Sequence, residues 1–320
     1  MTGQCLLQRL LWVAVLLSGF LAHAAEADAC LDRTIPVNVF TEGGDQVTTL
    51  KAVDFRASVG KKLVHVTSAT YDSGPRRIAV LIDVSGSMSE PPGKLAWSLK
   101  FVQDFVSLAP TADSLALLTF ASHIEDHMDF GQSRTALLTE VFRLQTPDRE
   151  DLGEGMTALE DALVSAIGLL KKPRVGDAIY LVSDGGDNAS RSRESRVTAL
   201  LASAGVRVYS LLASPDVFTR QRTPEESPGP SGLRDLAIAT GGNSQVFFPG
   251  RDTVRDRDQL TRLSQILHSE ISSFTKLTVR LPEPLLKPDS WHLELVNAAG
   301  RQIKALVIYP HRLAPCVPTP

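Results

Sequence analysis

The chain has 320 residues, of which 43 % are hydrophobic and 22 % are charged. This composition is typical of a globular protein and excludes a disordered chain. The 33 Lys and Arg against 36 Asp and Glu give a net charge of −3, so we expect no nucleic-acid partner, which would favour a basic surplus. Three cysteines are too few for a disulfide-rich scaffold. The length allows about two domains at roughly 150 residues each.

Residues 1–24 have the pattern of a signal peptide. Arg9 is the only charged residue before Glu26, and an apolar run follows it at residues 10–22. Residues 22–24 (Ala-His-Ala) match a cleavage site. We expect cleavage near Ala24, a secreted or periplasmic protein, and no membrane span in the mature chain. This run is shorter than the about 20 apolar residues that are needed to cross a membrane. An uncleaved signal anchor is therefore the less favoured, second interpretation.

Cleavage would remove Cys5 and leave Cys30 and Cys316 near opposite ends of the mature chain. In an exported, oxidising compartment this pair predicts one disulfide that joins the two ends. The competing interpretation is a lipid on Cys30, as in bacterial lipoproteins. Residues 27–29 (Ala-Asp-Ala) lack the aliphatic residue expected before such a cysteine, so the disulfide is the favoured interpretation.

The hydrophobic pattern divides the rest of the chain into three segments. In residues 25–75, alternating and β-branched stretches predict strands at 35–40, 47–50, 53–57 and 63–70. In residues 76–272, continuous apolar runs such as 78–82 alternate with stretches of helical spacing, and the last helix is expected at 259–274. That alternation predicts an α/β fold with a mostly parallel sheet and helices on both faces. Residues 273–320 again predict short strands.

The two terminal segments are predicted to belong together. Neither is long enough to bury a convincing core alone, since very short chains rarely do so. We therefore expect residues 25–75 and 273–320 to pair into one small β domain. The α/β domain, residues 76–272, would then be an insertion in that β domain, and the expected disulfide would connect its two halves.

Carboxylates and hydroxyls stand at the ends of predicted strands. Asp83, Ser85 and Ser87 follow the first buried strand, and Asp184 follows the strand expected at 178–182. In open α/β sheets, ligands bind beyond the carboxyl ends of the strands, so these groups should meet at one edge. A donor set made only of oxygen suits a hard cation such as Mg²⁺.

This set resembles the metal-ion-dependent adhesion site of the von Willebrand factor type A (VWA) family. The family pattern is Asp-x-Ser-x-Ser, then a Thr, then an Asp in a Thr-Asp-Gly-like turn. Asp83, Ser85 and Ser87 match the first part, Thr157 the second, and Asp184, followed by Gly185, the third. The resemblance covers residues 76–272. The flanking strands are similar to those of a bacterial secreted VWA-related family.

The resemblance implies a doubly wound, Rossmann-like sheet that binds Mg²⁺, or else Mn²⁺ or Ca²⁺. It implies that Ser85 and Ser87 bind the metal directly and that Asp83 and Asp184 act mostly through water. Thr157 would join the coordination when a partner protein presents an Asp or Glu to the metal. The chain departs from the family at residues 155–157, which read Gly-Met-Thr rather than the usual Gly-Gly-Thr.

These expectations favour an exported, metal-dependent protein-binding module of the adhesion type. The alternative is a metal-independent scaffold or assembly protein of the cell envelope, in which the five residues serve loop geometry. An enzyme is not expected. Aspartate-based phosphatases need a second acidic residue two positions after the nucleophile, and Ser85 stands there.

Overall fold

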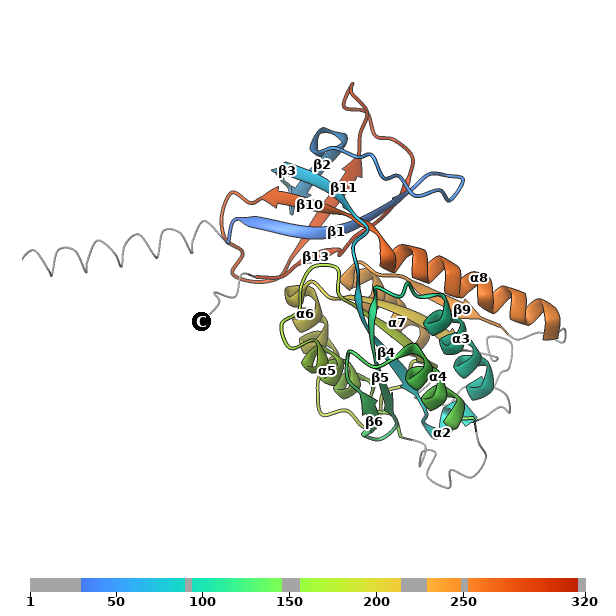
Figure 1. Cartoon of the computed structure of the whole chain (residues 1–320). Helices are drawn as coiled ribbons and strands as arrows, with labels where there is room; N and C mark the ends of the chain where they lie inside the picture. Colours follow the sequence, from blue (N-terminus) through green and yellow to red (C-terminus); the bar gives the residue numbers. More distant parts are fainter. Residues whose placement is uncertain (1–29, 90–93, 146–155, 214–228, 249–252, 316–320) are drawn as a thin grey trace, which may run out of the picture.

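The computed structural model describes residues 30–89, 94–145, 156–213, 229–248 and 253–315 (Figure 1). The middle of the chain forms a six-stranded sheet in the order β6-β5-β4-β7-β8-β9. Neighbouring strands are parallel except β5 and β6, which are antiparallel. The strands are β4 (Arg77–Asp83), β5 (Ser114–Phe120), β6 (Ile124–Met128), β7 (Ala178–Ser183), β8 (Arg207–Ala213) and β9 (Ser244–Phe247).

Helices cover both faces of this sheet. Apolar side chains of α3, α4 and α8 pack on one face, and those of α5, α6 and α7 pack on the other. Because both faces are covered, β4 and β7 are apolar and buried along nearly their whole length. The predicted α/β fold class is confirmed. The helices are α2 (Gly86–Ser89), α3 (Lys94–Leu108), α4 (Arg134–Arg143), α5 (Leu159–Leu170), α6 (Glu194–Ala204), α7 (Gly229–Thr240) and α8 (Thr253–Ser272).

The first and last segments together form a seven-stranded antiparallel sheet, in the order β12-β1-β10-β3-β2-β11-β13. β10 lies between β1 and β3, and β11 pairs with β2, so strands from both chain ends are hydrogen-bonded to one another within one sheet. The predicted pairing of the terminal segments is thereby confirmed. The strands are β1 (Asp32–Phe40), β2 (Phe55–Val59), β3 (Lys62–Asp72), β10 (Phe274–Arg280), β11 (Asp289–Leu295), β12 (Leu306–Ile308) and β13 (Arg312–Leu313).

One predicted strand, at residues 47–50, is absent from the described structure. Val47 makes a single backbone hydrogen bond to Val39 at 2.8 Å, and no strand follows. The next residues form a short 3-10 turn, η1 (Ala52–Asp54), in which the Asp54 carboxylate accepts from the Lys51 amide at 2.7 Å. This local hydrogen bond competes with strand pairing, as short polar side chains often do.

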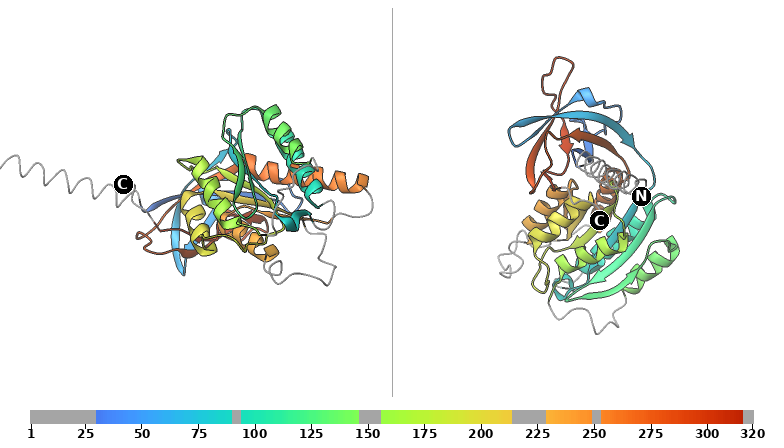
Figure 2. Two further views of the ribbon diagram at one scale, coloured as in Figure 1. Left: turned by 90° about the horizontal axis from the view of Figure 1, so that it is seen from below. Right: turned by 90° about the vertical axis from the view of Figure 1, so that its left-hand side faces the viewer.

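The seven-stranded sheet lies at one end of the α/β part, and α8 leads directly into β10 (Figures 1 and 2). Arg207, at the start of β8, is fully buried at this junction. Its guanidinium donates to Asn38 Oδ1 on β1 at 3.0 Å and to the carbonyl oxygens of Glu270 and Ile271 at 3.1 and 3.0 Å. The last carbonyls of a helix lack partners within the helix and carry partial negative charge. Arg207 therefore stabilises the end of α8 and holds β1 against it.

The two ends of the described chain also lie together. Arg33 donates to the carbonyl oxygen of Ala314 at 3.1 Å, and the amide of Leu281 donates to the Leu31 carbonyl at 2.8 Å. Cys30 directly precedes Leu31 in the chain. Cys316 and the expected signal peptide lie outside the described residues. Within the described ranges, no helix is long and apolar enough to cross a membrane.

We predict that Cys30 and Cys316 form a disulfide in the exported protein. Peptide mapping without reductant should find the cross-linked pair. Cys316→Ser should lower the free energy of unfolding by about 4–5 kcal/mol, because the unfolded chain then loses its long closed loop. A free thiol on either residue, or a lipid on Cys30, would contradict the prediction.

We predict a pH dependence of stability from Glu270, which is buried beside the Arg207 junction. Its Oε1 accepts from Asn243 at 3.0 Å, and burial raises the pKa of Glu270 to about 7. The same carboxyl has a pKa near 4.5 when unfolded. The folded state therefore keeps a proton that the unfolded state loses. The free energy of unfolding should fall between about pH 4.5 and 7, by up to about 3 kcal/mol.

Glu270→Gln keeps the acceptor for Asn243 and removes the charge, so it should make the decline smaller by up to about 3 kcal/mol. Urea denaturation at pH 5 and pH 8 measures the effect. Glu283→Gln is the control, because the Glu283 side chain is 68 % exposed and its removal should leave the decline unchanged. An equal decline in wild type and Glu270→Gln would contradict the assignment.

Candidate metal site

The parallel pairing of β4 and β7 brings the two predicted aspartates to one edge of the sheet. Ile82 pairs with Val182, Asp83 ends β4, and Asp184 directly follows β7. Both aspartates are buried, with exposed fractions of 0 % and 6 %. In Figure 1 this edge, marked by α2, lies at the end of the α/β part remote from the seven-stranded sheet.

Asp83 uses both carboxylate oxygens to order the loop that follows β4. Oδ1 accepts from the amide of Ser85 at 2.9 Å, and Oδ2 accepts from the hydroxyl of Ser183 at 2.6 Å. Burial, and then the negative charge of Asp184, raise the pKa of Asp83 to about 6. The ionised form of this carboxyl is thus disfavoured unless a cation lies nearby.

The two serines of the motif lie side by side. Their hydroxyl oxygens are 3.1 Å apart, Ser85 being buried and Ser87 partly exposed. The amide of Met88 donates to the Ser85 carbonyl at 3.0 Å, and the Met88 side chain is fully buried. This anchored turn presents two neutral oxygens close to the Asp83 carboxylate, as a hard cation requires.

Thr157 is held by the loop that follows Asp184. Its amide donates to Asn188 Oδ1 at 2.7 Å, and its carbonyl accepts from the amides of Asn188 and Ala189, both at 3.0 Å. Thr157 is 3 % exposed, whereas the neighbouring Met156, which departs from the VWA pattern, is 45 % exposed. The methionine side chain therefore lies toward solvent. Asn188 was not among the residues predicted for the site.

Lys94 is a residue of the site that the sequence did not reveal. Its Nζ donates to Asp184 Oδ2 at 2.6 Å and to the carbonyl oxygen of Ser87 at 2.9 Å, and its side chain is 4 % exposed. Lys94 is the first residue of α3, where the positive end of the helix dipole disfavours a cation. A lysine at the start of a helix is therefore unfavourable, and this feature of the sequence could have indicated that Lys94 has a specific role.

The residues brought together fit a divalent cation. All donors are oxygens, two carboxylates match a charge of +2, and Lys94 shows that the position already attracts a positive charge. Within the described part of the chain, no group of three or more His, Cys, Asp and Glu could hold a metal. A cation at this edge would therefore depend on the hydroxyls of Ser85, Ser87 and Thr157 as well as on the carboxylates.

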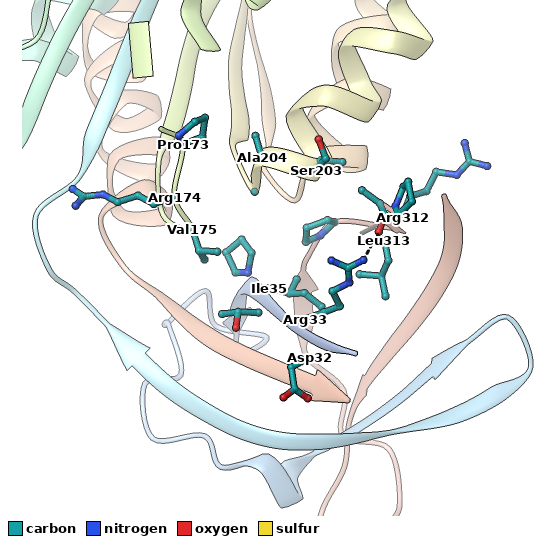
Figure 3. Close-up of a pocket in the computed structure, with 17 residues that line it drawn as sticks. Asp32, Arg33, Ile35, Pro173, Arg174, Val175, Ser203, Ala204, Arg312 and Leu313 are labelled. Atoms are coloured by element: carbon teal, nitrogen blue, oxygen red, sulfur yellow. Dashed lines mark hydrogen bonds between the residues drawn. The ribbon is translucent and has the colours of Figure 1, made fainter. Parts of the chain in front are cut away.

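A cavity of about 350 Å³ lies elsewhere, at the opposite edge of the six-stranded sheet (Figure 3). The cavity is lined by the residues before β7, the end of α6, β1, Pro310 and residues 312–315. Figure 3 shows the Arg33 side chain at one wall, bonded to the Ala314 carbonyl. None of the five predicted site residues borders this cavity, so it belongs to the junction of the two sheets.

Residues 78–186 match the family of von Willebrand factor type A domains. The match covers about a third of the chain and includes all five residues predicted for the site. It agrees with the VWA-like sheet described above. No curated protein matches the chain.

Several solved structures are similar to this chain. Proximal thread matrix protein 1 from the mussel byssus is 18 % identical, with a TM-score of 0.48, and the match covers 65 % of this chain and 49 % of that protein. This chain thus spans about half the length of that relative. A von Willebrand factor type A protein from Catenulispora acidiphila is 13 % identical, with coverages of 88 % and 73 % and a TM-score of 0.46. The PilB minor pilin from Streptococcus sanguinis is 13 % identical, with coverages of 62 % and 62 % and a TM-score of 0.43.

We predict that Asn188→Ala loosens the segment around Thr157. Loss of the acceptor leaves the buried Thr157 amide without its partner, which should lower the free energy of unfolding by about 1–2 kcal/mol. Hydrogen exchange followed by mass spectrometry should show faster exchange at Thr157. Asn297→Ala is the control, because it removes a similar side-chain acceptor from an exposed turn; equal exchange at Thr157 in both variants would contradict the prediction.

Proposed function

We propose that the protein is an exported protein-binding module of the adhesion type, which binds an acidic side chain of a partner through a divalent cation. The observation that carries the proposal is that Asp83, Ser85, Ser87 and Asp184 lie at one edge of a VWA-like sheet. Thr157, the fifth residue expected there, is held by the loop that follows Asp184. Export rests on the signal-peptide pattern of residues 1–24.

The charges of the site support this role. Asp83 and Asp184 together carry two negative charges, which balance a divalent ion, while Ser85, Ser87 and Thr157 contribute neutral oxygens. Mg²⁺, or else Mn²⁺ or Ca²⁺, would supply a Lewis-acidic position for one further carboxylate. The acidic side chain of a partner protein is a ligand of this kind. The edge faces away from the seven-stranded sheet (Figure 1), so the β domain would not obstruct the partner.

The surroundings of Asp83 argue against an enzyme. A nucleophilic carboxylate needs an oxygen that a substrate can reach, and Asp83 is fully buried. In the described structure, the carboxylate accepts from the Ser85 amide and the Ser183 hydroxyl. Both carboxylate oxygens are thus engaged in hydrogen bonds that order the loop after β4.

A metal-independent scaffold or assembly protein of the cell envelope is the second candidate. One observation favours it specifically, namely that the Lys94 ammonium already pairs with Asp184. In this alternative the five residues and Lys94 would only order the loops, and the partner would bind another surface.

We predict that partner binding requires the metal. Purified protein without residues 1–24 should bind one Mn²⁺, measured by electron paramagnetic resonance. Asp83→Asn, which keeps an acceptor for the Ser85 amide, should weaken binding at least about tenfold because it removes one of two balancing charges. Asp129→Asn, an exposed carboxylate of the same domain, is the matched control and should bind Mn²⁺ normally.

The same three proteins then serve as bait for envelope proteins, with Mg²⁺ or with EDTA. A partner that binds wild type and Asp129→Asn only with Mg²⁺, and never Asp83→Asn, supports the metal-dependent function. Capture of the same partner by all three proteins in EDTA would contradict it and favour the scaffold.

A further inference from the structure

Lys94 occupies a position inside the candidate metal site rather than at its rim. The side chains of Lys94 and Asp184 are 4 % and 5 % exposed, and Nζ lies 2.6 Å from Asp184 Oδ2. The same ammonium donates to the Ser87 carbonyl at 2.9 Å. One cation thus connects the turn that carries the two motif serines with the aspartate that ends the motif.

Burial makes this contact important for the Asp184 carboxylate. A charge removed from water is unfavourable unless a cation and hydrogen bonds compensate it. Among the described residues, the Gly186 amide also approaches this carboxylate, at the long distance of 3.5 Å. Lys94 therefore supplies most of the compensation when no metal is present.

A divalent cation would need the same negative charge. Two cations beside one buried carboxylate repel each other strongly, because the low dielectric of the interior screens little. A lysine ammonium, unlike a fixed metal, sits on a flexible four-carbon chain and can be displaced into solvent. Binding of the metal and burial of the ammonium are thus mutually exclusive on electrostatic grounds.

We propose that Lys94 is a built-in competitor of the divalent cation, whose ammonium occupies Asp184 in the metal-free protein and is expelled when the metal binds. This inference rests on the proposed function, since it concerns the same site. Lys94 then has two effects. The lysine weakens the apparent affinity of the site for the metal, and it keeps the loops around Asp184 ordered when no metal is bound.

The first test compares Lys94→Met with wild type in the full mature chain. Methionine keeps an unbranched apolar stem and removes the charge. Mn²⁺ affinity, measured by electron paramagnetic resonance, should rise at least about tenfold, and the melting temperature in EDTA should fall. Lys100→Met is the matched control, because Lys100 lies on the same helix and pairs with Asp104 outside the site; it should leave the affinity unchanged.

The outcomes separate this inference from the proposed function. Equal Mn²⁺ affinity in wild type and a folded Lys94→Met protein overturns the competition and leaves metal-dependent binding intact. Binding by Lys94→Met but not by wild type supports the competition and overturns the metal-dependent function. Absence of binding in both proteins overturns both.

A second measurement needs no variant and so covers the case in which Lys94→Met fails to fold. An amine-reactive acetylating reagent, quantified by mass spectrometry, should modify Lys94 slowly in EDTA and at least about tenfold faster with saturating Mn²⁺. Lys100, 37 % exposed, is the internal reference and should react alike in both conditions. Equal protection of Lys94 with bound Mn²⁺ would overturn the proposal.

Discussion

The candidate site depends on one electrostatic constraint, namely that two carboxylates are buried at the ends of adjacent parallel strands. Asp83 is fully buried and Asp184 nearly so, and ionised groups in such positions require a positive charge or donors. Asp83 is satisfied by the Ser85 amide and the Ser183 hydroxyl, whereas Asp184 relies on the Lys94 ammonium. The loops that carry the serines and Asn188 are ordered around these requirements. An empty, uncompensated site would be unfavourable, so some cation belongs to the folded state.

The same principle operates at the other end of the sheet, where the two parts of the molecule meet. Arg207 bonds the last carbonyls of α8, and Arg76 donates to the Ser272 carbonyl at 3.0 Å. Both guanidinium groups also lie 4.5 Å from the centre of the Phe274 ring, the first residue of β10. Buried cations thus hold the helix end and the β domain together, although the two parts have separate hydrophobic cores.

Much of the fold could be predicted from the sequence, because its signals are local and strong. The continuous apolar run at 78–82 indicates a strand covered on both faces, and β4 is such a strand. The predictions that failed concern segments in which a weak local preference for strand or helix was overridden by a competing interaction. The expected strand at 47–50 is replaced by a loop that leads into the turn capped by Asp54. The last helix was expected at 259–274 but ends at Ser272, because Phe274 pairs with Asp72 of β3.

The sequence by itself determined which chemical groups follow which strands, since hydrophobic periodicity locates strand ends and the motif residues stand beside them. It also indicated that the terminal segments need each other. Only the tertiary structure decided what surrounds those groups. Lys94 and Asp184 are 90 residues apart in the chain, and no periodicity relates them. Their contact exists because the packing of α3 against the sheet places the helix start beside β7, and burial then makes that single ion pair consequential.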